Sequence, residues 1–153
     1  MKYFGYKLIM LATLEGVPVC YDLLPANTDE RLAAEQLLEQ VRHCQLLCDK
    51  GFIGAFWQQE VLETLEVRVM TAKRKNQQEQ NPQELDTVVG SLRQRMEGVF
   101  NELQNLGKNL ERLLAKTVVG LGTRVAALVT SHTLKLFLRK VYHMDVQTFS
   151  FID

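Results

Sequence analysis

The sequence predicts a domain of class α/β, with a mixed sheet of the α+β kind, that ends in long helices. Two observations predict it. Residues 6–72 read in the order β-β-α-β-α-β, and from Val88 onward apolar residues recur every three or four positions. The chain has 153 residues, of which 46% are apolar and 24% charged, so it is long enough for one globular domain with a buried core.

The first element is predicted to be a hairpin. Two strands within residues 6–27 are joined at a turn around Glu15. A helix over residues 27–41 follows, because Asn27 or Thr28 can cap it and acidic residues occupy its first turn.

Three shorter elements come next. Residues 44–49, CQLLCD, form a short apolar run that is typical of a strand buried on both faces. Residues 54–65 predict a brief helix, and the alternation in residues 66–72 predicts a further strand.

The second half of the chain is predicted to be helical. Residues 76–86 are polar and lack aromatic side chains, so we expect a mobile connection there. The apolar spacing then predicts a helix over residues 88–110 and another over residues 123–142, with an interruption at Gly120 and Gly122.

Charge is distributed unevenly along the chain. Residues 1–105 carry 11 basic and 15 acidic side chains, whereas residues 106–153 carry 7 and 3. A basic end of this kind can meet an anion such as nucleic acid, and a helix with a solvated basic face explains the charge equally well. The longest stretch without a charge, Val125–Leu134, has ten residues and is too short to cross a bilayer, so we expect no membrane partner.

Two acidic residues are candidates for a site. Asp49 ends an apolar strand, where open α/β sheets place their functional groups, although a cap or turn role fits its position as well. Glu97 lies near the edge of the apolar face of its helix, and Arg93 shares that face four residues earlier. A surface Arg–Glu pair is the simpler interpretation of those two residues.

The isolated aromatic and histidine residues are predicted to be structural. His132 lies on an apolar helix, where a packed or capping histidine is the usual case, and His43 and His143 are expected to be exposed. Trp57 is expected in the core rather than as a platform for stacking bases. The odd number of cysteines, three, indicates reduced thiols in a cytoplasmic protein.

Several motifs together resemble the catalytic domain of DDE transposases from bacterial insertion sequences. In order, from about Tyr3 to Leu138, they are GYKLIMLATLEGVPVCYDLLPANTDER, CDKGFIG, TAKRKNQ, RQRMEGVFNEL and GLGTRVAALVTSHTLKLFL. The resemblance implies an RNase-H-like fold in which two aspartates and a glutamate hold divalent metal. It assigns the second aspartate to Asp49, the glutamate to Glu97, and to Arg93 an arginine that often precedes the glutamate by one helical turn.

The resemblance also implies a chemistry and a set of partners. DNA strands at the transposon ends would be cleaved and transferred to target DNA with Mg²⁺ or Mn²⁺, held by Asp49 and Glu97, because hard cations prefer carboxylate oxygens. The basic run Lys73, Arg74 and Lys75 could contact phosphates or form a solvated loop. Such a protein is expected in the bacterial cytoplasm, associated with the nucleoid, and association into a homo-oligomer is compatible with it.

The chain departs from the family pattern at three positions. The family's first aspartate lies on a strand before the hairpin, and Asp22 is a poor substitute for it. Gln104 and Gly90 replace a lysine and a tyrosine found in many relatives.

These departures predict one partial catalytic domain over residues 1–153, RNase-H-like but lacking its first, central strand and inactive alone. A non-catalytic remnant that binds DNA or a transposase is the alternative, and a purely structural domain is a third interpretation.

Overall fold

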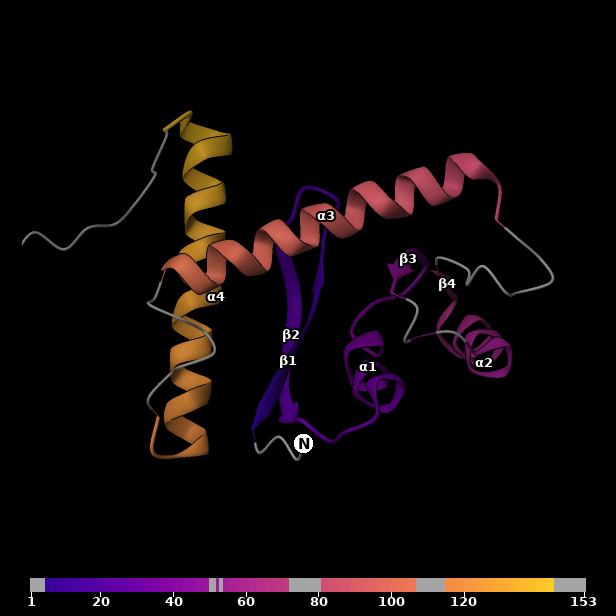
Figure 1. Cartoon of the computed structure of the whole chain (residues 1–153), viewed down its shortest axis with the longest axis horizontal. Helices are drawn as coiled ribbons and strands as arrows, with labels where there is room; N and C mark the ends of the chain where they lie inside the picture. Colours follow the sequence, from indigo (N-terminus) through magenta and orange to yellow (C-terminus); the bar gives the residue numbers. More distant parts are fainter. Residues whose placement is uncertain (1–4, 50–51, 53, 72–80, 107–114, 145–153) are drawn as a thin grey trace, which may run out of the picture. The chain divides into compact units, whose positions relative to one another are not determined.

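The computed structural model describes residues 5–49, 52, 54–71, 81–106 and 115–144. The chain divides into two compact units. Unit 1 comprises Met1–Ala12 and Val19–Arg95, and unit 2 comprises Thr13–Pro18 and Met96–Asp153. The architecture is mixed α+β with small sheets and two long helices near the carboxyl end (Figure 1).

The predicted hairpin is confirmed. Strands β1 (Tyr6–Ala12) and β2 (Pro18–Pro25) pair with each other. The turn between them is closed by two backbone hydrogen bonds, from Thr13 N to the Val17 carbonyl at 2.8 Å and from Gly16 N to the Thr13 carbonyl at 2.9 Å. Gly16 has a φ of 86°, which lies in the region that glycine adopts without strain.

The rest of unit 1 follows the predicted α-β-α-β order. Its elements are α1 (Glu30–Leu38), β3 (Cys44–Cys48), α2 (Ala55–Leu65) and β4 (Val67–Thr71). Strands β3 and β4 are parallel and in register from Cys44 opposite Val67 to Cys48 opposite Thr71, with α2 as the connection between them. Figure 1 shows α1 and α2 beside this strand pair.

Unit 1 has a core that joins both helices to the β3–β4 pair. Val67 is fully buried, and the core consists of Ala34, Leu38, Leu46, Trp57, Val61, Val67 and Val69. Trp57 donates a hydrogen bond from Nε1 to Glu35 Oε1 at 3.1 Å. The prediction that Trp57 belongs to the core is therefore confirmed.

Three local features of unit 1 differ from the prediction. The four described strands form two separate two-stranded sheets instead of one mixed sheet. Strand β3 is not buried on both faces, because Leu46 is buried whereas Gln45 is exposed. The cap of α1 is Asp29, whose side chain accepts a hydrogen bond from Arg31 N, because the residues before it are used in a turn closed by Thr28 N and the Pro25 carbonyl.

Two non-glycine residues with left-handed backbone conformations precede the parallel strands. His43 has a φ of 51° and Glu66 a φ of 56°, and each lies directly before the first paired residue of β3 or β4. Their exposed side chains contact each other through His43 Nδ1 and Glu66 Oε2. The two strands therefore start side by side from matching turns.

Helix α3 (Gln83–Leu106) contributes residues to both units. Residues 83–86, which we placed in a mobile connection, are helical, and residues 76–80 of that connection lie outside the described residues. Acidic side chains in the first turn favour this earlier start, because the amino-terminal end of a helix carries partial positive charge. Asn81 also donates from Nδ2 to the Thr71 carbonyl at 3.1 Å and to Asp86 Oδ1 at 3.0 Å. These two hydrogen bonds connect the end of β4 to the first turn of α3.

Helix α4 (Val118–Tyr142) begins earlier than predicted. The expected interruption at Gly120 and Gly122 is wrong, because both glycines lie within the helix. Thr117 caps it, with its side-chain oxygen accepting a hydrogen bond from Gly120 N at 3.0 Å. A cap of this kind offsets the weak helix preference of the two glycines.

The core of unit 2 is built from α3, α4 and the hairpin turn. Its buried apolar side chains are Val99, Leu103, Val125, Leu128 and Val129. A Cβ at Gly16 would lie only 2.9 Å from the Val99 side chain, so the turn packs closely on α3. In the part of the chain that the structure describes, no helix has the length and apolar character needed to cross a membrane.

Candidate functional site

Asp49 is positioned by the end of β3. It follows Cys48, the last residue of the strand, and its carbonyl accepts a hydrogen bond from Phe52 N at 3.0 Å. The chain therefore turns at once, and its exposed carboxylate lies at the carboxyl end of a parallel strand, the edge where α/β sheets place functional groups.

Arg93 of α3 faces this carboxylate. Its Nη1 lies 3.5 Å from Asp49 Oδ1, and both side chains are 59% exposed. Both residues belong to unit 1. An ion pair this exposed contributes only about 0–1 kcal/mol to stability. Its contribution to the stability of the fold is therefore small.

Glu97 lies one helical turn after Arg93 on α3, with an exposed side chain. Its neighbour Val99 is buried, and Met96 and Phe100 are partly buried, so Glu97 borders the apolar face as predicted. Glu97 belongs to unit 2, whereas Asp49 belongs to unit 1.

The remaining predicted site residues are Lys73, Arg74 and Lys75. All three lie outside the described residues. Their proposed contact with phosphate stays a prediction.

The residue types at Asp49 suit a divalent cation. A carboxylate at a strand end offers the hard oxygen that Mg²⁺ and Mn²⁺ prefer, whereas the Arg93 guanidinium beside it is a positive charge that opposes a second cation. Within the described ranges, the structure brings together no group of three or more His, Cys, Asp or Glu side chains.

Sequence reasoning missed a polar cluster in unit 2. We call Glu102, His132 and Lys135 the Glu102 cluster. Lys135 Nζ donates to Glu102 Oε1 at 2.8 Å, and His132 Nδ1 lies 2.9 Å from Oε2, although not in hydrogen-bond alignment. His132 is 1% exposed and its Nε2 lies 3.2 Å from the Gly16 carbonyl. The histidine therefore links both helices to the hairpin turn.

The surroundings of Glu102 favour its ionised form. Partial burial acts to raise the pKa of Glu102, but the hydrogen bond and charge of Lys135, with the charges of His132 and Arg139, lower that pKa below its ordinary value of 4.5. The cluster is therefore a structural ion-pair network. The prediction that His132 is packed is confirmed, and His43 and His143 are exposed as expected.

Cys48 lies next to Asp49, and its surroundings disfavour the nucleophilic thiolate form. Burial raises the pKa of the Cys48 thiol to about 11, so the thiolate is scarce at neutral pH. All three cysteines are free.

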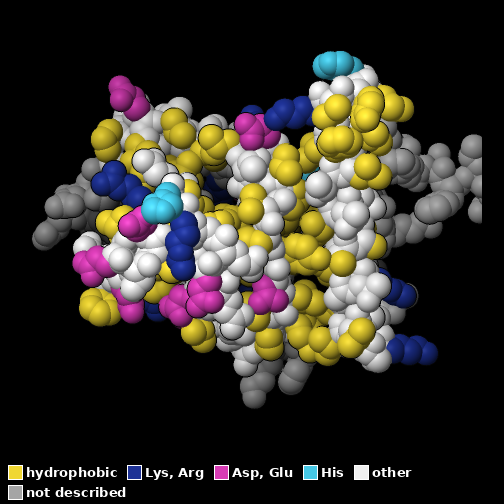
Figure 2. Space-filling view, turned by 180° about the vertical axis from the view of Figure 1, so that it is seen from behind, with side chains coloured by type: hydrophobic (Ala, Val, Ile, Leu, Met, Phe, Trp, Pro, Cys, Tyr) yellow, Lys and Arg dark blue, Asp and Glu magenta, His cyan; other side chains and the backbone are white. Residues whose placement is uncertain are grey.

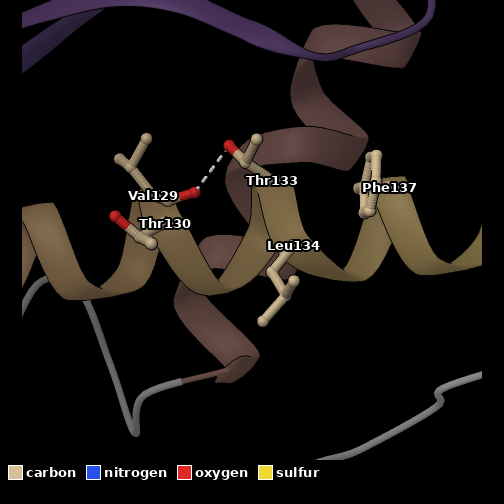
Figure 3. Close-up of a pocket in the computed structure, with 5 residues that line it drawn as sticks. All are labelled: Val129, Thr130, Thr133, Leu134 and Phe137. Atoms are coloured by element: carbon tan, nitrogen blue, oxygen red, sulfur yellow. Dashed lines mark hydrogen bonds between the residues drawn. The ribbon is translucent and has the colours of Figure 1, made fainter.

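A shallow pocket on α4 is lined by Val129, Thr130, Thr133, Leu134 and Phe137. Figure 3 shows these five side chains along one helix, with the hydrogen bond from Thr133 Oγ1 to the Val129 carbonyl at 2.9 Å. Hydrophobic side chains also gather over the last turns of α4 in Figure 2. The pocket lining carries no ionisable group, so it offers no acid, base or metal ligand.

The fold and the Asp49–Arg93 pair define a mixed α+β protein with an acidic residue at the end of a parallel strand. A family model described as a transposase DDE domain matches residues 2–113. The chain belongs to this family, and the resemblance to DDE transposases seen in the sequence is confirmed over these residues. The family implies an RNase-H-like fold, the use of divalent metal ions and DNA as substrate. The comparisons with curated proteins and with solved structures gave no match.

Proposed function

We propose that this chain carries part of the catalytic site of a transposase from an insertion sequence. In this proposal Asp49 and Glu97 are metal ligands, and the metal is Mg²⁺ or Mn²⁺. The observation that supports it most directly is the family membership, together with Asp49 at the end of β3 facing an arginine of the helix that also carries Glu97.

The protein groups have separate roles in this proposal. Asp49 and Glu97 supply oxygen ligands, and Arg93 positions a carboxylate or a phosphate through its paired donors. Lys73, Arg74 and Lys75 contact DNA phosphates. When bound, the divalent ions supply an activated oxygen nucleophile and stabilise the leaving oxygen of the phosphodiester.

The 153 residues hold two of the three acidic positions that the resemblance calls for. We therefore expect the isolated polypeptide to bind divalent cations weakly and to leave DNA uncut.

In the cell, we place the transposase in the cytoplasm with the nucleoid, acting on transposon ends and target DNA, with a homo-oligomer as its working form.

A titration of Mn²⁺, followed by the electron paramagnetic resonance signal of the free ion, tests the ligand assignment. Asp49→Ala and Glu97→Ala should each weaken Mn²⁺ binding several-fold, whereas Glu84→Ala, an exposed glutamate at the start of α3, should not. Equal binding by all four proteins would remove both residues from the metal site. A nicking assay with Mg²⁺ or Mn²⁺ tests the expected inactivity, which cleavage that depends on Asp49 would overturn.

A second candidate function is a non-catalytic module that binds DNA. Helix α4 carries three exposed basic residues, Arg124, Arg139 and Lys140, and no acidic residue, which favours contact with a polyanion. Binding that falls steeply with added salt, and that is unchanged in Asp49→Ala and Glu97→Ala, supports this module over the catalytic role.

A further inference from the structure

The ion pair between Asp49 and Arg93 has the geometry of a loose contact. A charge-assisted hydrogen bond between guanidinium and carboxylate normally measures about 2.7–2.9 Å, whereas Arg93 Nη1 lies 3.5 Å from Asp49 Oδ1. Both side chains are more than half exposed, so water reaches both partners of this contact.

The same carboxylate would serve two cations if Asp49 is a metal ligand. A divalent ion bound to the carboxylate would lie close to the Arg93 guanidinium, and the like charges would repel. The arginine side chain is long and exposed, and it starts from a rigid helix, so it can turn away while its backbone stays in place.

We propose that Arg93 is an exchangeable counter-ion for Asp49. It neutralises the carboxylate while no metal is bound and leaves it when a divalent cation binds. The proposal rests on the proposed function, since it takes Asp49 as a metal ligand. It predicts that Arg93 lowers the metal affinity of the site, in contrast to an arginine that only supports the ligand.

Mn²⁺ affinity of the full 153-residue chain tests this directly. Arg93→Gln should bind Mn²⁺ about two- to five-fold more tightly than the parent chain, as expected from the loss of one exposed competing charge. Arg95→Gln, an exposed arginine of the same helix, is the matched control and should leave the affinity unchanged. In the double variant Asp49→Asn with Arg93→Gln, affinity should equal that of Asp49→Asn alone.

A second readout follows the arginine itself. Addition of diamagnetic Mg²⁺ should shift the Nε–H resonance of Arg93 in the parent chain, and Asp49→Asn should abolish that shift. A resonance that does not move when Mg²⁺ saturates the site would overturn the proposal.

The outcomes separate this proposal from the proposed function. If Asp49→Asn weakens Mn²⁺ binding but Arg93→Gln binds no more tightly than the parent chain, Asp49 remains a ligand and only the exchange is wrong. If Asp49→Asn has no effect on Mn²⁺ binding, the metal role of Asp49 fails and the exchange fails with it.

Discussion

Units 1 and 2 each place a carboxylate beside a cation, but in opposite surroundings. In unit 1, Asp49 and Arg93 face each other with 59% of each side chain exposed. In unit 2, Glu102 lies between Lys135, which is 7% exposed, and His132, which is 1% exposed. Burial makes the second arrangement expensive to disrupt, and exposure makes the first one easy to rearrange. The comparison indicates that the Glu102 cluster stabilises unit 2, whereas the Asp49–Arg93 pair contributes little to the stability of unit 1.

Removal of the Glu102 carboxylate should have the largest effect on stability. Glu102→Ala leaves Lys135 buried without its partner, so the free energy of unfolding should fall by about 3 kcal/mol. Urea unfolding followed by far-ultraviolet circular dichroism measures the loss. The control is Glu84→Ala on the same helix, which should cost less than about 1 kcal/mol. A loss no larger than that of the control would place the Glu102 cluster on a par with the exposed pair.

Acid should remove part of the same stabilisation. Because the pKa of Glu102 is lowered in the folded chain, its contribution is complete above its ordinary value of 4.5 and is lost as the pH falls through the lowered pKa. The stability difference between the parent chain and Glu102→Gln should therefore shrink as the pH falls below 4.5. Urea unfolding at a series of pH values measures it. A difference that grows in acid would contradict the assignment.

Loss of the hydrogen bond between Trp57 and Glu35 should have an intermediate effect on the free energy of unfolding. Glu35→Ala leaves the indole N–H of a buried tryptophan without its acceptor, at a cost of about 1 kcal/mol, whereas Glu35→Gln keeps an acceptor oxygen. Trp57 is the only tryptophan, so its fluorescence during urea unfolding reports on unit 1. Gln36→Ala, the exposed neighbour, serves as the control and should behave like the parent chain.

The smallest effect is expected at the exposed pair of unit 1. Asp49→Ala should change the free energy of unfolding by less than about 1 kcal/mol, and 1 M salt should remove most of that change by screening. Unfolding followed by Trp57 fluorescence at low and high salt measures both quantities. A loss near that of Glu102→Ala would mean that Asp49 is structural, and the contrast between the units would disappear.

Local periodicity was enough to predict most of the fold. The turn around Glu15 predicted the hairpin, a short apolar run predicted β3, and alternation predicted β4, while steps of three and four predicted the long helices. The early start of α4 was not predicted, because the weak helix preference of two glycines suggested a break, whereas both lie inside a helix that Thr117 caps.

The candidate site, like the fold, was predicted from the sequence only in part. A charged residue after an apolar run drew attention to Asp49, and its pairing with Arg93 depends on a contact between residues 44 positions apart. The Glu102 cluster was missed because His132 and Lys135 lie some 30 residues from their partner. One signal could have found it: Lys135 falls three residues after His132, on the apolar face of α4, where a lysine needs an acidic partner from another element.

The left-handed residues before β3 and β4 have a consequence for engineering. His43 and Glu66 hold a conformation that costs a side-chain-bearing residue about 1 kcal/mol and that glycine adopts freely. Glycine usually lowers the stability of a folded protein, but at these two positions it is the natural replacement. A glycine scan should show that glycine is tolerated at both positions. Substitutions intended to raise the stability of the protein should therefore begin at these turns rather than in the core.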